Sequence, residues 1–284
     1  MDFLEMEVGG RQRLVGLISG ASDVDSIIVH VHGYGGDLFS NTFVREQHRL
    51  SPAYNLGFAS LRLPTSSYID EDYTDIGVRY IGSSLVHPNE SVRYIAEVVG
   101  RLQEAYRHVF LQGHSFGTNL VKEIVSGPFG DSLSGAIFLS PADSASLQAM
   151  FIKEGRAKGQ DSSDGIVWNT FGIATGDRSY PIPIMNSLFT DIVSSSIFNT
   201  WSAPNLGSLR LPWLVVRASG DSIANAGSLA SLDAFGAEPE GGRAVELASQ
   251  SHAFADQVPV LVSMIFGWVS ESMERARTRR NRDT

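Results

Sequence analysis

The residues best suited to carry out chemistry surround one serine, Ser115, in the segment LQGHSFGTN. Gly113 and Gly117 lie two residues to either side of it, and the apolar run VFLQ comes just before. A serine hydroxyl is a weak nucleophile until a base activates it, and a tight strand-to-helix turn can present it to such a base. The pattern predicts that Ser115 is a nucleophile; the alternative is a purely structural turn in another α/β protein.

Two backbone N–H groups are predicted to form an oxyanion hole beside this serine. Phe116 follows it at the expected start of a helix, where free N–H groups favour negative charge. The second donor is assigned to Tyr34 in the segment HVHGYGG, because the glycines there let the backbone approach a reacting centre closely. His32 is expected to steady this loop by hydrogen bonding.

Two other interpretations of HVHGYGG are weaker. His30 and His32 share one face of a strand and could bind a metal ion, but the sequence offers no matching third ligand. The segment GYGGDL lacks the last glycine of the dinucleotide-binding pattern G-x-G-x-x-G and does not follow the first strand. We therefore expect neither a metal ion nor a cofactor.

The base and the acid are sought further along the chain, because the order nucleophile, acid, histidine is expected for this arrangement of strands. Of the seven histidines, His252 in ELASQSHAFAD is the only one after Ser115. Asp221 in VVRASGDSIAN is predicted to fix the imidazole tautomer. Asp143, at the end of LSPAD, is the rival acid, since its loop reaches the same rim; either aspartate could instead belong to an ordinary turn.

An alternation of apolar strands and amphipathic helices is expected to position these residues. The opening reads as a hairpin, with strands FLEMEV and RLVGLISG around a GGRQ turn. Further strands are expected at SIIVHVHG, GFASLRLP, HVFLQ, GAIFLSPAD, LPWLVVRASGD and GRAVELAS, with helices between them and a last helix from Val258. Asn89 or Ser91 is expected to cap the helix NESVRYIAEVVGRLQEAY, and the Arg-rich C-terminal end is expected to be frayed and solvated. This order predicts an α/β fold with a doubly wound, mostly parallel sheet of about eight strands.

The strand rhythm is interrupted once, and the interruption defines the predicted domains. Residues 1–143 and 211–284 form the two parts of the core, and residues 144–210 form a helical cap insertion without an obvious sheet strand. The aromatic and methionine content of this cap suits an apolar pocket. Residues 65–88 are expected to form a long, polar, tyrosine-rich loop. Substrate-binding residues are predicted from these two segments: Tyr68, Tyr73, Trp168, Tyr180 and Met185.

The overall composition argues against several classes of function. Lysine and arginine number 22 against 31 aspartates and glutamates, a net charge of −9, which makes nucleic acid a poor partner. Cysteine is absent, so disulfides, thiolate metal sites and a cysteine nucleophile are excluded. No apolar run is long enough to span a membrane, and the start lacks a signal-peptide pattern. We expect a cytoplasmic protein whose partner is a small-molecule ester or acyl substrate.

The motifs HGYGG and GHSFG, the Asp221 loop and SHAFAD, in this order, resemble the α/β-hydrolase superfamily from about residue 13 to residue 270. More narrowly, LSPAD, KEGRAKG and YPIPIMNSLF are similar to the cap segment of hydrolases related to siderophore esterases. The resemblance implies cofactor-free hydrolysis of an ester, thioester or amide. By matching positions it assigns the catalytic and oxyanion roles to Ser115, His252, Asp221, Tyr34 and Phe116.

The leading hypothesis is a serine hydrolase that cleaves a carboxylic ester through an acyl-enzyme. The same intermediate could serve an acyltransferase, a cyclase or a thioesterase that acts on a carrier-bound acyl or peptidyl chain in secondary metabolism. A third possibility is a non-catalytic ligand-binding protein on the same scaffold, since a fold does not determine function. Nucleophilic aspartate chemistry is disfavoured because the residue at the turn is serine.

Overall fold

The computed structural model describes residues 1–20, 23–66, 70–74, 77–81, 86–142, 166–169, 182–185, 206–221 and 241–283. For residues 70–74, 77–81, 166–169, 182–185 and 279–283 it describes the backbone alone.

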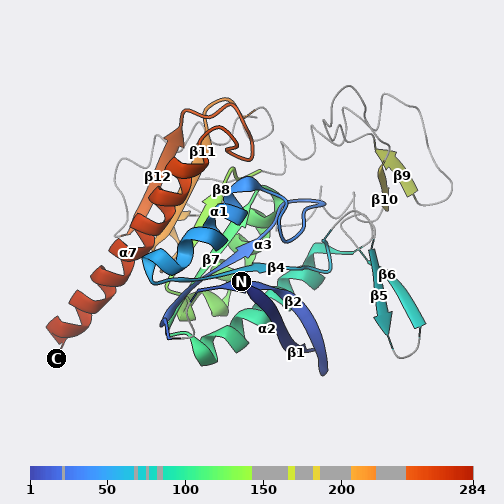
Figure 1. Ribbon diagram of the computed structural model, residues 1–284, viewed down its shortest axis with the longest axis horizontal. Helices are drawn as coiled ribbons and strands as arrows, with labels where there is room; N and C mark the ends of the chain where they lie inside the picture. Colours follow the sequence, from blue (N-terminus) through green and yellow to red (C-terminus); the bar gives the residue numbers. More distant parts are fainter. Residues whose placement is uncertain are drawn as a thin grey trace.

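An eight-stranded sheet forms the centre of the fold (Figure 1). Its strands, in spatial order, are β1 (Asp2–Val8), β2 (Arg11–Ser19), β4 (Gly57–Leu61), β3 (Ser26–Val31), β7 (His108–His114), β8 (Gly135–Leu139), β11 (Trp213–Ala218) and β12 (Gly242–Leu247). The β1–β2 and β2–β4 pairs are antiparallel, and every later pair is parallel. The predicted mostly parallel sheet of about eight strands is therefore confirmed.

The predicted N-terminal hairpin is formed by β1 and β2. Gly9 and Gly10 connect the two strands, and both have left-handed backbones, with φ angles of 61° and 75°. Two consecutive residues with positive φ match the right-handed twist of the flanking strands, and only glycine adopts that conformation without strain. The GG pair in the sequence thus accounts for the tight turn.

Helices cover both faces of the sheet, as the predicted doubly wound arrangement requires (Figure 1). On one face, α2 (Pro88–Ala105) and α3 (Phe116–Ser126) contribute to one hydrophobic cluster. On the other face, α1 (Thr42–Leu50) and α7 (Val258–Asp283) contribute to a second cluster. Short 3₁₀ helices follow α1 at Ser51–Tyr54 and α3 at Pro128–Ser132. The strands β3, β4 and β8 are buried throughout, because both of their faces are covered.

The start of α2 differs from the prediction. Neither Asn89 nor Ser91 caps the helix; His87 occupies the cap, and its Nδ1 atom accepts a hydrogen bond from the Asn89 N–H at 3.1 Å. Pro88 is the first helical residue, a position that suits its fixed φ and its missing N–H. Histidine is not among the common capping residues, and the sequence pattern therefore favoured the wrong side chains.

Two short strand pairs lie outside the main sheet, and neither was predicted. Strand β5 (Asp70–Thr74) pairs with β6 (Gly77–Ile81) inside the segment expected to be a loop. Strand β9 (Ile166–Asn169) pairs with β10 (Ile182–Met185) inside the expected helical cap. Both pairs are antiparallel and local, so they form without the long apolar alternation that marks a core strand. The other residues of 143–205 lie outside the described ranges, and the helical cap stays a prediction.

The last helix, α7, continues through the Arg-rich end to Asp283 instead of fraying (Figure 1). The side chains of residues 274–278 are exposed, as expected for a charged segment. In the part of the chain that the structure describes, no helix combines the length and apolarity needed to cross a bilayer.

Candidate active site

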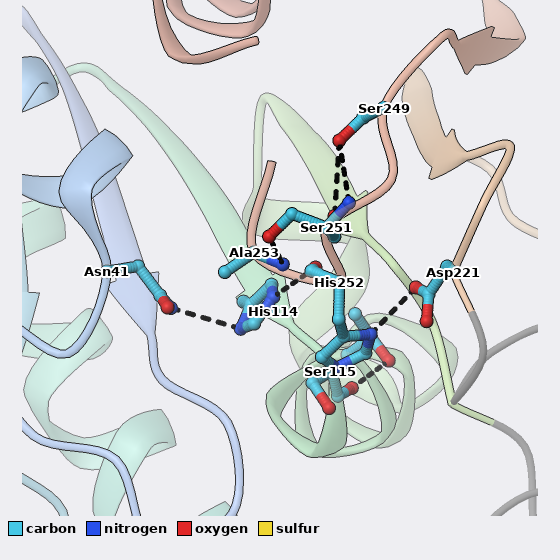
Figure 2. A network of polar contacts seen from close by, with 9 residues as sticks. Asn41, His114, Ser115, Asp221, Ser249, Ser251, His252 and Ala253 are labelled. Carbon is cyan, nitrogen blue, oxygen red and sulfur yellow. Dashed lines mark hydrogen bonds and ion pairs between the residues drawn. The ribbon is translucent and has the colours of Figure 1, made fainter. Parts of the chain in front are cut away.

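The predicted catalytic residues gather at one edge of the sheet, where the parallel strands end. Ser115 follows β7, the glycine loop after His32 follows β3, Asp221 follows β11 and His252 follows β12. The carboxyl ends of parallel strands meet at a single edge, which is where ligands bind in open α/β sheets. Residues more than a hundred positions apart therefore come together there (Figure 2).

Ser115 lies in a strained turn between β7 and α3. Its backbone has φ 52° and ψ −123°, a conformation that residues other than glycine rarely adopt. The turn is held by hydrogen bonds from the Ser115 N–H to the Leu139 carbonyl and from the Thr118 N–H to the Ser115 carbonyl, both at 2.9 Å. Ser115 occupies the N-cap of α3, but its hydroxyl makes no capping hydrogen bond. The Ser115 hydroxyl is therefore not used to cap the helix.

The glycines around Ser115 are required by close backbone contacts. A Cβ atom on Gly113 would lie 2.6 Å from the Gly117 carbonyl oxygen, and one on Gly117 would lie 2.4 Å from the His32 carbonyl oxygen. A Cβ atom on Gly33 would lie 3.2 Å from the Cβ atom of Ser115. Strand, helix and glycine loop therefore pack backbone against backbone, and the glycine loop lies next to the serine.

His252 and Asp221 form a hydrogen-bonded pair. The Nδ1 atom of His252 lies 2.7 Å from Oδ2 of Asp221. The Asp221 side chain is completely buried, whereas 20% of the His252 side chain is exposed. The carboxylate accepts this hydrogen bond, so the proton lies on Nδ1, and the tautomer that this selects has no proton on Nε2. In Figure 2 the ring of His252 lies over the turn that carries Ser115, with Asp221 to one side.

Backbone hydrogen bonds join the loop that carries Asp221 to the loop that carries His252. The Ser219 N–H donates to the Leu247 carbonyl at 2.9 Å, and the Gly220 N–H donates to the Ser249 carbonyl at 2.8 Å. These bonds continue the β11–β12 pairing beyond the strands. The position of Asp221 relative to His252 is therefore fixed by the backbone as well as by their side chains.

Asp256 organises the His252 loop, a role that was not predicted from the sequence. Its carboxylate accepts hydrogen bonds from the Ser249 hydroxyl, at 2.5 Å, and from the Gln250 N–H, at 3.1 Å. The same two bonds, the Ser249 one first, lower the pKa of this carboxyl. Phe254 anchors the loop in the core, with a completely buried ring and a left-handed φ of 54°. The only sequence signal was the aspartate at the end of SHAFAD.

The glycine loop after β3 is held by His32, as the sequence predicted. Nδ1 of His32 donates to the Gly33 carbonyl at 2.8 Å, and Nε2 lies 2.8 Å from the hydroxyl of Ser66. Burial lowers the pKa of His32 and keeps the ring neutral. The rings of Tyr34 and Phe116 pack edge to face, 5.6 Å apart. The two residues predicted to supply the oxyanion N–H groups are therefore neighbours.

His30 takes part in a buried hydrogen-bond network. Its Nδ1 atom accepts a hydrogen bond from the Gln112 amide at 2.9 Å, and Gln112 also pairs with Gln47. Burial lowers the pKa of His30 well below its ordinary value. Within the described ranges, no three His, Cys, Asp or Glu side chains are grouped to hold a metal ion.

The predicted substrate-binding residues and the rival acid fall largely outside the described residues. Tyr68, Tyr180 and Asp143 are not described. Tyr73, Trp168 and Met185 lie on β5, β9 and β10, where the backbone alone is described. Their proposed contacts with substrate stay predictions.

Comparison with solved structures decides the fold family. No protein-family model matches the chain, and neither does any curated protein sequence. Est1E from Butyrivibrio proteoclasticus, solved with ferulic acid, matches with a TM-score of 0.66 and 11% identity, over 95% of this chain and 99% of that one. The chain has the α/β-hydrolase fold.

Other proteins with the α/β-hydrolase fold match over similar lengths. A monoglyceride lipase from Saccharomyces cerevisiae has a TM-score of 0.62 and 10% identity, over 95% of both chains. The thioesterase domain of the curacin biosynthetic pathway has a TM-score of 0.57 and 15% identity, over 94% of this chain and 99% of that one. The narrower resemblance to siderophore esterases stays a prediction.

Proposed function

We propose that this chain is a serine hydrolase that cleaves a carboxylic ester, or a related thioester or amide, through an acyl-enzyme on Ser115. The observation that carries the proposal is the His252–Asp221 pair, 2.7 Å between Nδ1 and Oδ2, at the same sheet edge as the strained Ser115 turn. The esterases, lipase and thioesterase that share the fold support the same class of reaction.

The proposed proton transfers follow from the tautomer of His252. Asp221 accepts a hydrogen bond from the Nδ1–H of His252, so Nε2 is the free base that removes the proton from the Ser115 hydroxyl. The Ser115 oxygen then bonds to the substrate carbonyl carbon, and the carbonyl π electrons move to oxygen. The same Nε2 then gives the proton to the leaving alcohol, thiol or amine. The carbonyl re-forms as the bond between its carbon and the leaving group breaks. Water then attacks the acyl-enzyme through the same proton transfers, and the carboxylic acid is released from Ser115.

The proposed oxyanion hole uses the backbone N–H groups of Tyr34 and Phe116. Phe116 is the first residue of α3, at the helix end where the backbone dipoles favour negative charge. Tyr34 follows Gly33, the residue whose missing side chain allows close approach to Ser115. Loss of one such donor in a comparable enzyme costs about 100- to 1000-fold in kcat.

The proposal is tested with p-nitrophenyl esters of graded acyl length. We expect the wild-type protein to release p-nitrophenol catalytically, with a preferred chain length that reports pocket depth. Ser115→Ala should be inactive, and Ser263→Ala, an exposed serine on α7, should match the wild type. Equal turnover by wild type and Ser115→Ala would refute the proposal.

The identity of the acyl acceptor is a separate question. The thioesterase domain that shares the fold comes from a biosynthetic pathway, and an amine or alcohol could take the acyl group in place of water. Product analysis by mass spectrometry, with a thioester substrate and a competing amine, distinguishes the cases. We expect the free acid as the main product; an amide as the main product would indicate acyl transfer.

A further inference from the structure

His114, the residue immediately before Ser115, joins two loops of the proposed site. It is the last residue of β7, and only 4% of the residue's surface is exposed. Its Nε2 atom lies 3.0 Å from the backbone carbonyl oxygen of His252, and its Nδ1 atom lies 3.2 Å from Nδ2 of Asn41. Figure 2 shows this line of contacts from Asn41 through His114 to His252.

One tautomer of His114 satisfies both contacts. The carbonyl of His252 can only accept, so Nε2 of His114 must carry the proton. Burial, followed by the nearby His252, lowers the pKa of His114 to about 3, so the ring is neutral and Nδ1 is an acceptor. The Asn41 amide must therefore donate to it. The direction of every hydrogen bond in this line is thereby determined.

The side chain of Asn41 contacts His114 and does not cap its own helix. It occupies the N-cap of α1, a position where asparagine commonly accepts a hydrogen bond from the helix backbone, yet its side chain makes no capping bond. Asn41 also closes the loop that begins at Gly33 and contains Tyr34. The amide thus connects the end of the proposed oxyanion loop to His114.

Aromatic packing holds the His114 ring in place. Phe43, on α1, packs edge to face against it, with ring centroids 5.4 Å apart. Phe254, in the His252 loop, packs edge to face against Phe43, with ring centroids 6.5 Å apart. His114 therefore has a fixed orientation and is a rigid link between α1 and the His252 loop.

We propose that His114 is a positioning residue: with Asn41 as its donor, it holds the backbone of His252 so that the imidazole stays aligned between Ser115 and Asp221. This inference rests on the proposed base role of His252. Because the link acts on the His252 backbone and touches no substrate, its loss should lower kcat and leave KM nearly unchanged. Small displacements of a catalytic group cost up to about 100-fold in rate, and we expect a loss of about 10- to 100-fold.

The test compares His114→Leu with His114→Gln, which keeps one donor and one acceptor. We expect His114→Leu to lose about 10- to 100-fold in kcat with little change in KM, and His114→Gln to recover about tenfold of that loss. His108→Leu makes the same change at the opposite end of β7 and should leave kcat unaltered. Asn41→Ala should give a smaller loss that is not additive with His114→Leu.

A second readout does not require turnover. The proton between His252 and Asp221 should give a far-downfield NMR resonance, identified by its absence in His252→Ala. We expect the resonance to be lost through exchange with solvent in His114→Leu and to persist in His114→Gln and His108→Leu. A sharp resonance in folded His114→Leu would overturn the positioning role. Should His114→Leu not fold, a sharp resonance and unchanged kcat in Asn41→Ala would overturn it.

The two proposals fail in different ways. If the wild type neither hydrolyses esters nor reacts at Ser115, the proposed function fails, and the NMR comparison still decides whether His114 orders His252. If the wild type is active and His114→Leu matches it in kcat, the positioning role alone is refuted.

Discussion

Nδ1 of His252 lies 2.7 Å from Oδ2 of Asp221, in a pair whose carboxylate is fully buried and whose imidazole is partly exposed. The arrangement allows the proposed base to reach a substrate, while the acid is shielded from water. A buried carboxylate needs partners, and this one obtains a hydrogen bond from the imidazole that it orients. A substitution that removes only the Asp221 carboxylate and leaves His252 in place therefore tests the role of Asp221 by itself.

Replacing Asp221 with asparagine should nearly abolish activity without unfolding the protein. The amide can donate to Nδ1, which favours the imidazole tautomer with the proton on Nε2, where it cannot act as base. In a comparable triad this change costs about 10⁴-fold in kcat. Steady-state kinetics measure the effect, with Asp131→Asn, a surface residue 3.6 Å from Arg210, as the control. Unchanged kcat in Asp221→Asn would rule out its role.

Removing the Asp256 carboxylate should loosen the His252 loop. Asp256→Ala deletes the acceptor of the Ser249 hydroxyl and the Gln250 N–H, and we expect kcat to fall by about tenfold through misplacement of His252. Ser249→Ala removes one of the same bonds and should give a smaller loss. Wild-type kcat in both variants would show that the loop is held by other contacts.

A side chain at Gly117 should destabilise the fold. The Cβ atom of alanine would lie 2.4 Å from the His32 carbonyl oxygen, so backbone must move, and the expected cost is about 1–3 kcal/mol. Gly267→Ala, on α7, is the control; its Cβ atom meets nothing within 4 Å, and it should stabilise the protein by about 0.4–1 kcal/mol. Urea unfolding measures both values. Equal stability of Gly117→Ala and wild type would contradict the packing described.

The buried neutral histidines should make the protein less stable in mild acid. Burial lowers the pKa of His48 from 6.5 to about 4, so between these values the unfolded chain binds a proton that the native state does not. The free energy of unfolding should therefore decrease as pH falls from about 6.5 to about 4, by at most about 1.4 kcal/mol per pH unit for each such histidine.

His48→Gln tests the contribution of one ring. His48 lies 2.8 Å from the hydroxyls of both Ser19 and Ser60, which glutamine can replace only in part, so overall stability should also fall. The informative quantity is the slope: the variant should lose stability less steeply than wild type between pH 6.5 and pH 4. Identical slopes would contradict the neutral state of His48.

Local patterns in the sequence were sufficient to predict the sheet and the serine turn. The glycines at 113 and 117 stand at fixed distances from Ser115 in the chain, and the close contacts that require them lie within the same strand–turn–helix unit and its neighbour β3. Gly9 and Gly10 likewise specify a two-residue turn by conformation alone. The Asp221–His252 juxtaposition could be anticipated because both loops follow adjacent parallel strands.

Features that depend on distant partners could not be predicted. The contact between Asn41 and His114 joins residues 73 positions apart, and only the structure shows that Asn41 does not cap its own helix. Strand β5 begins with three acidic residues, and β6 is only five residues long, so no extended apolar pattern marks this pair. His87 caps α2 through a ring nitrogen, an uncommon use of histidine that the sequence pattern does not indicate.

The central claim is tested most directly by covalent labelling with a fluorophosphonate, followed by peptide mapping of the adduct. The account predicts a single adduct on Ser115, absent in Ser115→Ala and formed far more slowly in His252→Ala. An adduct on another residue, or none under conditions that fully label a control serine esterase while the protein is folded, would contradict it.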